Sequence, residues 1–120
     1  MKLLKTLTYT EKRSRFICYL YEVTSEKEAK EAYQEVEKLN KKAKHILKAS
    51  CYYNAYQVKL TAFSEDREPI SSMKKLASLM DKENYLNKEV IIVRYFGGVL
   101  FGASYLDRVY YALGDKILKS

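Results

Sequence analysis

The sequence has no tryptophan, one proline and four glycines, and its apolar runs are short. So little proline and glycine leaves no room for a flexible linker, and we therefore expect one domain over residues 1–120. The longest uncharged apolar stretches fall far below the roughly 20 residues of a membrane helix. The first residues also lack the apolar core of a signal peptide. These absences predict a cytoplasmic protein that does not enter a membrane.

Metal-binding and redox residues are equally scarce. The chain has two cysteines, Cys18 and Cys51, and a single histidine, His45. There is no Cys-x-x-Cys, so buried, reduced cysteines are expected and a metal site is not. Neither glycine-rich phosphate-binding motif occurs, and His45 has no suitably spaced nucleophile. The sequence therefore predicts no cofactor and no catalysis.

Positive charge is abundant and uneven. The net charge is +7, and the first sixty residues hold 13 lysines and arginines against 7 acids. Five lysines and no acid fall between Lys38 and Lys48. Such a run attracts phosphate, but lysines also favour the negative end of a helix. Both interpretations stay open.

Alternating and helical periodicities predict an α+β domain with the order ββαβαβα. Strands are expected at Leu3–Tyr9, Ser14–Val23, Cys51–Leu60 and Val90–Val93, with both faces of the second apolar. Ser25 and Glu28 form a capping box for a helix that runs to about Asn40. Two further helices are expected around residues 73–80 and 104–117. We expect a mixed sheet of about four strands with the helices packed on one face.

The junction of the last strand with Arg94-Tyr95-Phe96-Gly97-Gly98 is the most informative segment. Its paired glycines allow a turn that other residues disfavour. Arg94 could hold a phosphate or an acidic peptide, or it could pair with Asp66 or Glu68 in the acidic loop (residues 65–69). An enzyme using Asp66 and Glu68 as a carboxylate pair is the weakest alternative.

The chain has twelve tyrosines. Tyr52 and Tyr53 follow the lysine run, so an aromatic strand face beside lysines could stack unpaired bases. The simpler interpretation is that each tyrosine is half-buried with its hydroxyl in water. The candidate nucleic-acid-binding residues are Lys41, Lys42, Lys44, Lys48, Tyr52, Tyr53 and Arg94.

Four segments resemble the Impact N-terminal domain family, which includes the bacterial YigZ type and the eukaryotic regulator Impact. They are Lys12–Ile17, Ala55-Tyr56, Asp66–Pro69 and Arg94–Gly98. The resemblance implies a fold like the second domain of a small-subunit ribosomal protein. It also implies a bare, single-domain member, because the additional domains of other members do not fit in this length. The family motif positions are Arg15, Phe16, Asp66, Glu68, Pro69, Arg94, Tyr95, Phe96, Gly97, Gly98 and Gly102.

The chain departs from the family at several polar and glycine positions. Cys51, Tyr52 and Tyr53 replace a His-Asn-Cys stretch, and Arg67 replaces the glycine of the acidic loop. The resemblance and the charge together predict a non-catalytic module of translation or its regulation. It would bind RNA or a ribosome-associated protein through a basic and aromatic surface. The alternative is a module that docks an acidic protein without nucleic acid.

Overall fold

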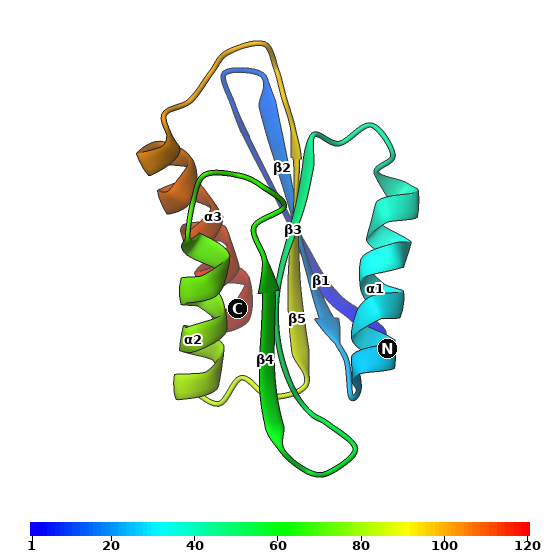
Figure 1. Cartoon of the computed structure of the whole chain (residues 1–120). Helices are drawn as coiled ribbons and strands as arrows, with labels where there is room; N and C mark the ends of the chain where they lie inside the picture. The colour runs from blue at the N-terminus through cyan, green and yellow to red at the C-terminus, as the bar shows by residue number, and fades with distance from the viewer.

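The computed structural model describes residues 1–120, and it contains five strands and three helices (Figure 1). The α+β class is confirmed. In chain order the elements are β1 (Lys2–Glu11), β2 (Ser14–Glu22), α1 (Glu26–Leu39), β3 (His45–Tyr53), β4 (Lys59–Ser64), α2 (Ser72–Lys82), β5 (Lys88–Tyr95) and α3 (Ala103–Lys119).

The strands form one sheet in the order β1-β2-β5-β3-β4, with β1 and β4 at its edges. All four strand pairs are antiparallel, so the expected mixed sheet of about four strands is corrected to an antiparallel sheet of five. The register brings the start of β3 beside the end of β5, where His45 pairs with Arg94. Segments about fifty residues apart in sequence therefore meet at one end of the sheet.

The additional strand arises from the segment predicted as a single strand over Cys51–Leu60. It is a hairpin: β3 ends at Tyr53 and β4 begins at Lys59. The side chain of Asn54 accepts hydrogen bonds from the backbone N–H groups of Tyr56 (2.8 Å) and Val58 (3.1 Å). This side-chain turn reverses the chain without glycine or proline. It also leaves Tyr56 in the turn and not on a strand face.

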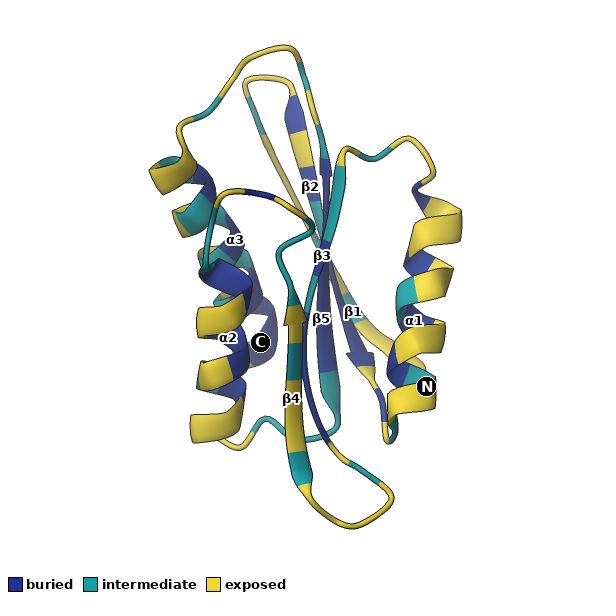
Figure 2. Cartoon of the chain, in the orientation of Figure 1, coloured by how far each residue is buried: buried dark blue, intermediate teal, exposed yellow.

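Helices cover both faces of the sheet (Figure 1). Helices α2 and α3 pack on one face, and α1 packs on the other. The structure thereby corrects the expected placement of all helices on one face. The physical reason lies in β2, which sends Phe16 and Cys18 to the α2–α3 side and Tyr19 and Tyr21 to the α1 side. Two apolar faces both need cover, as the buried central strands in Figure 2 show.

The first helix begins and ends where its capping residues predict. The Oγ of Ser25 accepts a hydrogen bond from the N–H of Glu28 (3.1 Å). The Glu28 carboxylate in turn accepts one from the N–H of Thr24 (2.9 Å), which lowers the pKa of Glu28. At the other end, the Asn40 amide donates to the carbonyl of Val36 (2.9 Å). These contacts satisfy helix-end groups that would otherwise be unpaired.

Both cysteines are free and buried, as predicted, in the cluster between the sheet and the helices α2 and α3. Burial raises the pKa of the Cys18 thiol well above its usual value. None of the three helices has the length and hydropathy needed to cross a bilayer.

Candidate functional site

A buried ion pair joins the acidic loop to the end of β5. The Arg94 guanidinium donates two hydrogen bonds of 2.9 Å to the two carboxylate oxygens of Glu68. Glu68 is 6% exposed and Arg94 is 5% exposed. The ion pair considered as an alternative for Arg94 is therefore present, with Glu68 as its partner. A bidentate pair of this kind fixes both direction and distance between two segments.

Tyr110 of α3 completes this pair. Its hydroxyl donates to the carboxylate of Glu68 (2.5 Å) and accepts from Nε of Arg94 (3.1 Å). Burial and the hydrogen bond to Glu68 raise the pKa of Tyr110 far above its usual value. Burial lowers the pKa of Arg94, but the hydrogen bond and charge of Glu68 outweigh burial and raise it. The three groups therefore form one neutralised unit of an anion, a cation and a neutral phenol.

The other acids of the loop also turn inward. The Asp66 carboxylate accepts a hydrogen bond from the backbone N–H of Ile46 (2.7 Å), and Nδ1 of His45 lies 2.8 Å from the Asp66 carbonyl oxygen. Nε2 of His45 lies 3.2 Å from the Glu68 carboxylate. Glu65 accepts hydrogen bonds from two N–H groups in the first turn of α2, at 3.1 Å each. The three acids of the loop are thus bonded within the domain, and the Asp66 side chain stays 30% exposed.

Two of the three glycines between β5 and α3 have a physical reason to be glycine. A Cβ at Gly97 would lie 2.2 Å from the backbone carbon of Arg13, so only glycine allows the loop to touch the turn between β1 and β2. Gly98 has a φ of +91°, which side chains disfavour. Gly102 is the N-cap of α3. Pro69 follows Glu68 in the acidic loop and is exposed.

Three exposed cations lie over aromatic rings of the segment that follows Arg94. The Arg15 guanidinium lies 4.7 Å from the centre of the Tyr95 ring, and the Lys44 ammonium lies 5.0 Å from that of Phe96. Lys12 lies 6.0 Å from the centre of Phe101. Through these contacts the loop after β5 lies between two other turns. One is the turn between β1 and β2, and the other is the turn between α1 and β3.

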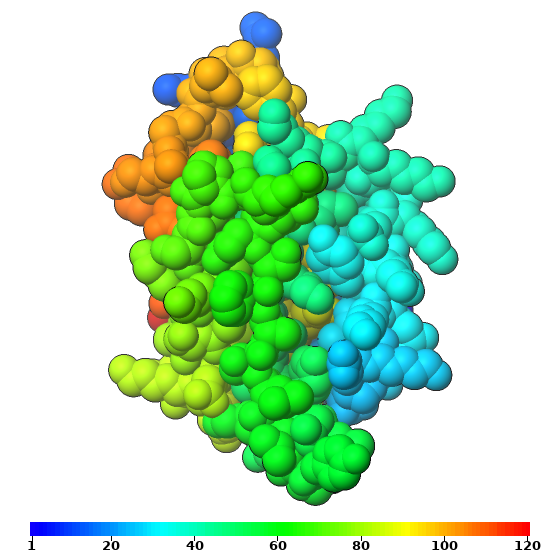
Figure 3. All heavy atoms as spheres, viewed as in Figure 1, coloured from blue at the N-terminus to red at the C-terminus, as the bar shows by residue number.

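We name the resulting surface the basic end. Figure 3 shows the tip of the first hairpin and the loop after β5 protruding together at the top of the view. The backbone N–H of Lys44 donates to the carbonyl of Arg94 (2.8 Å), which attaches the lysine turn to the same strand end. We define the basic end as the exposed cations of the two segments that adjoin the end of β5: Lys12, Arg13 and Arg15 of the first hairpin, and Lys41, Lys42 and Lys44 of the turn before β3. Of these, Arg15 lies over Tyr95 and Lys44 over Phe96.

Only part of the predicted nucleic-acid-binding set lies there. Lys41, Lys42 and Lys44 belong to the basic end, whereas Arg94 is buried in its pair with Glu68. The Lys48 ammonium lies 5.2 Å from the Tyr33 ring centre, on the half-buried side of β3 that faces α1.

The two predicted tyrosines are not beside the lysines either. Tyr52 is 5% exposed and packs in the cluster beneath α1. Tyr53 is 39% exposed but lies at the opposite end of β3, roughly 25 Å from the lysine turn at 3.3 Å per residue. No stacking surface is formed by Tyr52 and Tyr53 together with Lys41, Lys42 and Lys44.

Sequence reasoning missed several residues of this region. His45 and Tyr110 were not assigned to the ion-pair unit, and Lys12 and Arg13 were not assigned to a binding surface. The sequence did indicate Lys12 and Arg13, because adjacent cations in a two-residue hairpin turn must be exposed. It gave no such indication for His45 and Tyr110, because their partners lie sixteen or more residues away in the chain.

The groups considered for acid–base chemistry do come together, but no pocket opens onto their centre. A shallow hollow of about 200 Å³ beside α1 is lined partly by Lys41, Lys44, His45 and Asp66. Neither Glu68 nor Arg94 reaches it. Residues 1–120 contain no cluster of three or more metal-ligating side chains. The arrangement can fix two loops relative to one another and display cations outside them.

Comparisons with known proteins identify this fold and its motifs. Residues 12–118 match the sequence model of the Impact N-terminal domain. The chain is 31% identical over 99 residues to the IMPACT family member YvyE of Bacillus subtilis, covering 82% of this chain and 45% of that protein. It is 28% identical over 100 residues to an IMPACT family member of Haemophilus influenzae, covering 82% and 48%. The chain thus spans about half the length of these relatives.

Two solved structures share the fold. A crystal structure of a hypothetical protein superposes with a TM-score of 0.83 at 24% identity, over 96% of this chain and 56% of the other. The two-domain translational regulator Yih1 superposes with a TM-score of 0.57 at 20% identity, over 92% and 46%. The motif positions, the fold and the match over residues 12–118 lead to one conclusion: the chain belongs to the Impact N-terminal domain family.

Proposed function

We propose that this domain is a non-catalytic binding module of translation or its regulation, and that it binds RNA through the basic end. Family membership and the description of Yih1 as a translational regulator support the biological setting. The proposed place of action is the cytoplasm, where translation occurs. Glu68, Arg94 and Tyr110 are buried and hydrogen-bonded to one another. This supports a role without catalysis, because these side chains are engaged with each other and not available to a substrate.

The separation of charge at the basic end carries the proposal. The carboxylates of Glu65, Asp66 and Glu68 accept hydrogen bonds from backbone and side-chain groups of the domain. The six cations of the basic end face solvent on the first hairpin and on the turn before β3. The hairpin contacts the loop after β5 at Gly97, and the turn is bonded to the end of β5 at Arg94. The cations of the basic end outnumber the carboxylates beside them, Glu37 and Asp66, so this surface attracts a polyanion.

The aromatic rings favour RNA with unpaired bases. Phe96 is 41% exposed beneath Lys44, so a base could stack on the ring while its phosphate meets the ammonium. Stacking on an aromatic side chain contributes roughly 1–3 kcal/mol per base and tolerates any sequence. We therefore expect single-stranded RNA to bind more tightly than duplex RNA or duplex DNA.

Fluorescence anisotropy with labelled single-stranded RNA, duplex RNA and duplex DNA at two salt concentrations tests this proposal. Contact with six phosphates would give a logarithmic salt slope of about −4 for a single strand. The triple variant K41E/K42E/K44E should abolish binding. The matched control K27E/K74E/K82E alters net charge equally at exposed positions outside the basic end, and it should retain most of the affinity.

Two results would contradict the proposal. The first is absence of binding to all three nucleic acids at low salt. The second is an equal loss of affinity in both triple variants, which would indicate nonspecific attraction by net charge. A pull-down with and without nuclease then separates the alternative, because an acidic protein partner of the basic end would survive nuclease treatment.

A further inference from the structure

The edge strand β1 has an open backbone. It is ten residues long and pairs on one side only, with β2. The turn between them consists of Lys12 and Arg13, both with positive φ, so the flanking pair of Glu11 and Ser14 is hydrogen-bonded. Hydrogen-bonded and open pairs alternate in an antiparallel ladder. The N–H and C=O groups of Thr6, Thr8 and Thr10 therefore point away from the sheet.

This part of the edge lacks the usual protection. Edge strands are commonly blocked by charged side chains, proline or a bulge. In β1 the bulge lies between Leu3 and Lys5, and both lysines of the strand, Lys2 and Lys5, precede residue 6. Residues 6–10 carry no charge and no proline. The other edge, β4, has six residues, and its Lys59 is engaged with Asp81 (2.9 Å).

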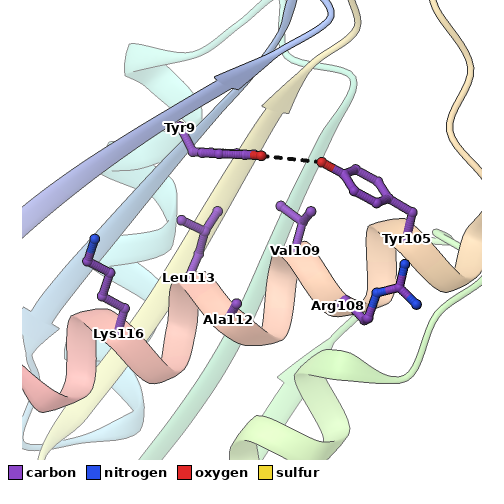
Figure 4. Close-up of a pocket in the computed structure, with 7 residues that line it drawn as sticks. All are labelled: Tyr9, Tyr105, Arg108, Val109, Ala112, Leu113 and Lys116. Atoms are coloured by element: carbon purple, nitrogen blue, oxygen red, sulfur yellow. Dashed lines mark hydrogen bonds between the residues drawn. The ribbon is translucent and has the colours of Figure 1, made fainter.

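An apolar groove runs beside the open stretch, between β1 and α3 (Figure 4). The hydroxyls of Tyr9 and Tyr105 are 3.3 Å apart and link the strand to the start of the helix. The groove has a volume of about 390 Å³ and no acid among its lining residues. These are Tyr9, Tyr105, Arg108, Val109, Ala112, Leu113 and Lys116.

The side chains of β1 alternate between the two faces of the sheet. Tyr9 contacts Phe16 and lies toward α3, as does Leu7, which packs against the α2–α3 cluster. The threonines therefore face the other side. A strand added outside β1 would continue this alternation, so every second side chain of that strand would lie over the groove.

We propose that the β1 edge and its groove bind an extended, acidic peptide segment of a partner protein. The peptide adds a strand, with its backbone on Thr6, Thr8 and Thr10 and alternate apolar side chains over Val109 and Leu113. Its acids meet Arg108 and Lys116, which supply the only charges in the groove lining. Because this site shares no residue with the basic end, it stands independently of RNA binding.

A labelled nine-residue peptide provides the test. It carries leucine at positions three, five and seven, aspartate at one and nine, and serine elsewhere. Anisotropy should show saturable binding, and a peptide with lysine for aspartate should bind at least tenfold more weakly. Amide resonances of Thr6, Thr8 and Thr10 should shift on titration and exchange with solvent more slowly.

Variants of the domain sharpen the test. T8P removes an outward N–H that β2 does not use, so it should preserve the fold and lower affinity at least tenfold, whereas T8V should bind as the parent does. A112E places an acid in the groove without changing the strand. It should also lower the affinity for the aspartate peptide at least tenfold.

Three results would overturn the proposal. One is no binding of the aspartate peptide at about 1 mM, equivalent to a binding free energy weaker than about −4 kcal/mol. Another is equal binding of the lysine peptide. The last is that light scattering shows a dimer of the parent domain and a monomer of T8P, since a second copy of the chain would then occupy the edge.

Discussion

Two buried glutamates, Glu68 and Glu89, have opposite surroundings in the same small domain. Glu68 receives two hydrogen bonds from Arg94 and one from Tyr110, with His45 close by. Glu89 on β5 is fully buried, and neither of its carboxylate oxygens has a hydrogen-bond partner within the protein. The first carboxylate is stabilised as an anion, and the second is not.

The difference shows that burial alone does not decide the charge of an acid. Burial raises the pKa of Glu89 to about 8, and the nearby charge of Lys48 offsets only part of this. Glu89 lies on the α1 face near Tyr21 and Tyr52, whose pKa values are raised chiefly by burial and to a smaller extent by the charge of Glu89. The Glu68 unit fixes loops, whereas the surroundings of Glu89 oppose its ionisation.

Removing the cation from the satisfied unit should have the largest effect. R94M leaves the Glu68 carboxylate buried without its bidentate partner, and a broken buried pair costs about 3–5 kcal/mol. Urea unfolding measures the loss. The control R15M removes an exposed arginine over Tyr95 and should cost less than about 1 kcal/mol. Similar costs for the two variants would show that the Glu68 unit stabilises little.

Neutralising the unsatisfied acid should change the pH dependence of stability. The pKa of Glu89 is about 8 in the folded state, against about 4.3 in an unfolded chain, so the folded state holds the proton more tightly. The free energy of unfolding therefore falls as pH rises between these values, by at most about 1.4 kcal/mol per pH unit.

E89Q removes this contribution. The difference between E89Q and the parent should grow by on the order of 3–4 kcal/mol from pH 5 to pH 8, in favour of the variant. Urea titrations at several pH values measure it. A constant difference across that range would mean that Glu89 is already ionised at pH 5.

Deleting one hydroxyl tests the satisfied unit more finely. Y110F removes a donor to Glu68 but leaves Arg94 in place, so we expect a loss of about 1.5 kcal/mol in the free energy of unfolding. Y111F, at the next position on α3 and outside the unit, is the control and should be close to neutral. A loss in Y111F as large as that in Y110F would point to general effects on the helix.

The smallest effect is expected at Lys48. Its charge lowers the pKa of Glu89, so K48M should raise that pKa and move the fall in stability to higher pH. The shift should be less than about one pH unit, because Lys48 is partly exposed and its charge is screened. The pH-dependent difference between K48M and K48M/E89Q measures it. A shift to lower pH would contradict the assignment.

Local signals predicted the helices better than the sheet. The first helix was placed correctly because Ser25, Glu28 and Asn40 act within a few residues of its ends. The hairpin of β3 and β4 was missed because its start lies within the lysine run, where alternate positions are polar. The turn depends on the side chain of Asn54, and the sequence contains no glycine or proline there to indicate it.

The candidate site was predictable only where charge is complementary. The pair of Arg94 with the acidic loop followed from opposite charges in two motifs. The burial of Tyr52 did not, because it depends on where α1 packs. The meeting of Arg15 and Lys44 on adjacent aromatic residues depends on the register of β5 between β2 and β3, and local sequence does not specify this register.

The contact of Gly97 with the Arg13 backbone has a consequence for mutagenesis. Any side chain at Gly97 would push the first hairpin away from the loop after β5 and spread the cations of the basic end. If the basic end binds RNA as proposed, a substitution there would weaken binding although glycine has no side chain for RNA to contact. In a binding screen Gly97 would therefore score as a contact residue, while its actual role is to set the spacing of charges that other residues carry.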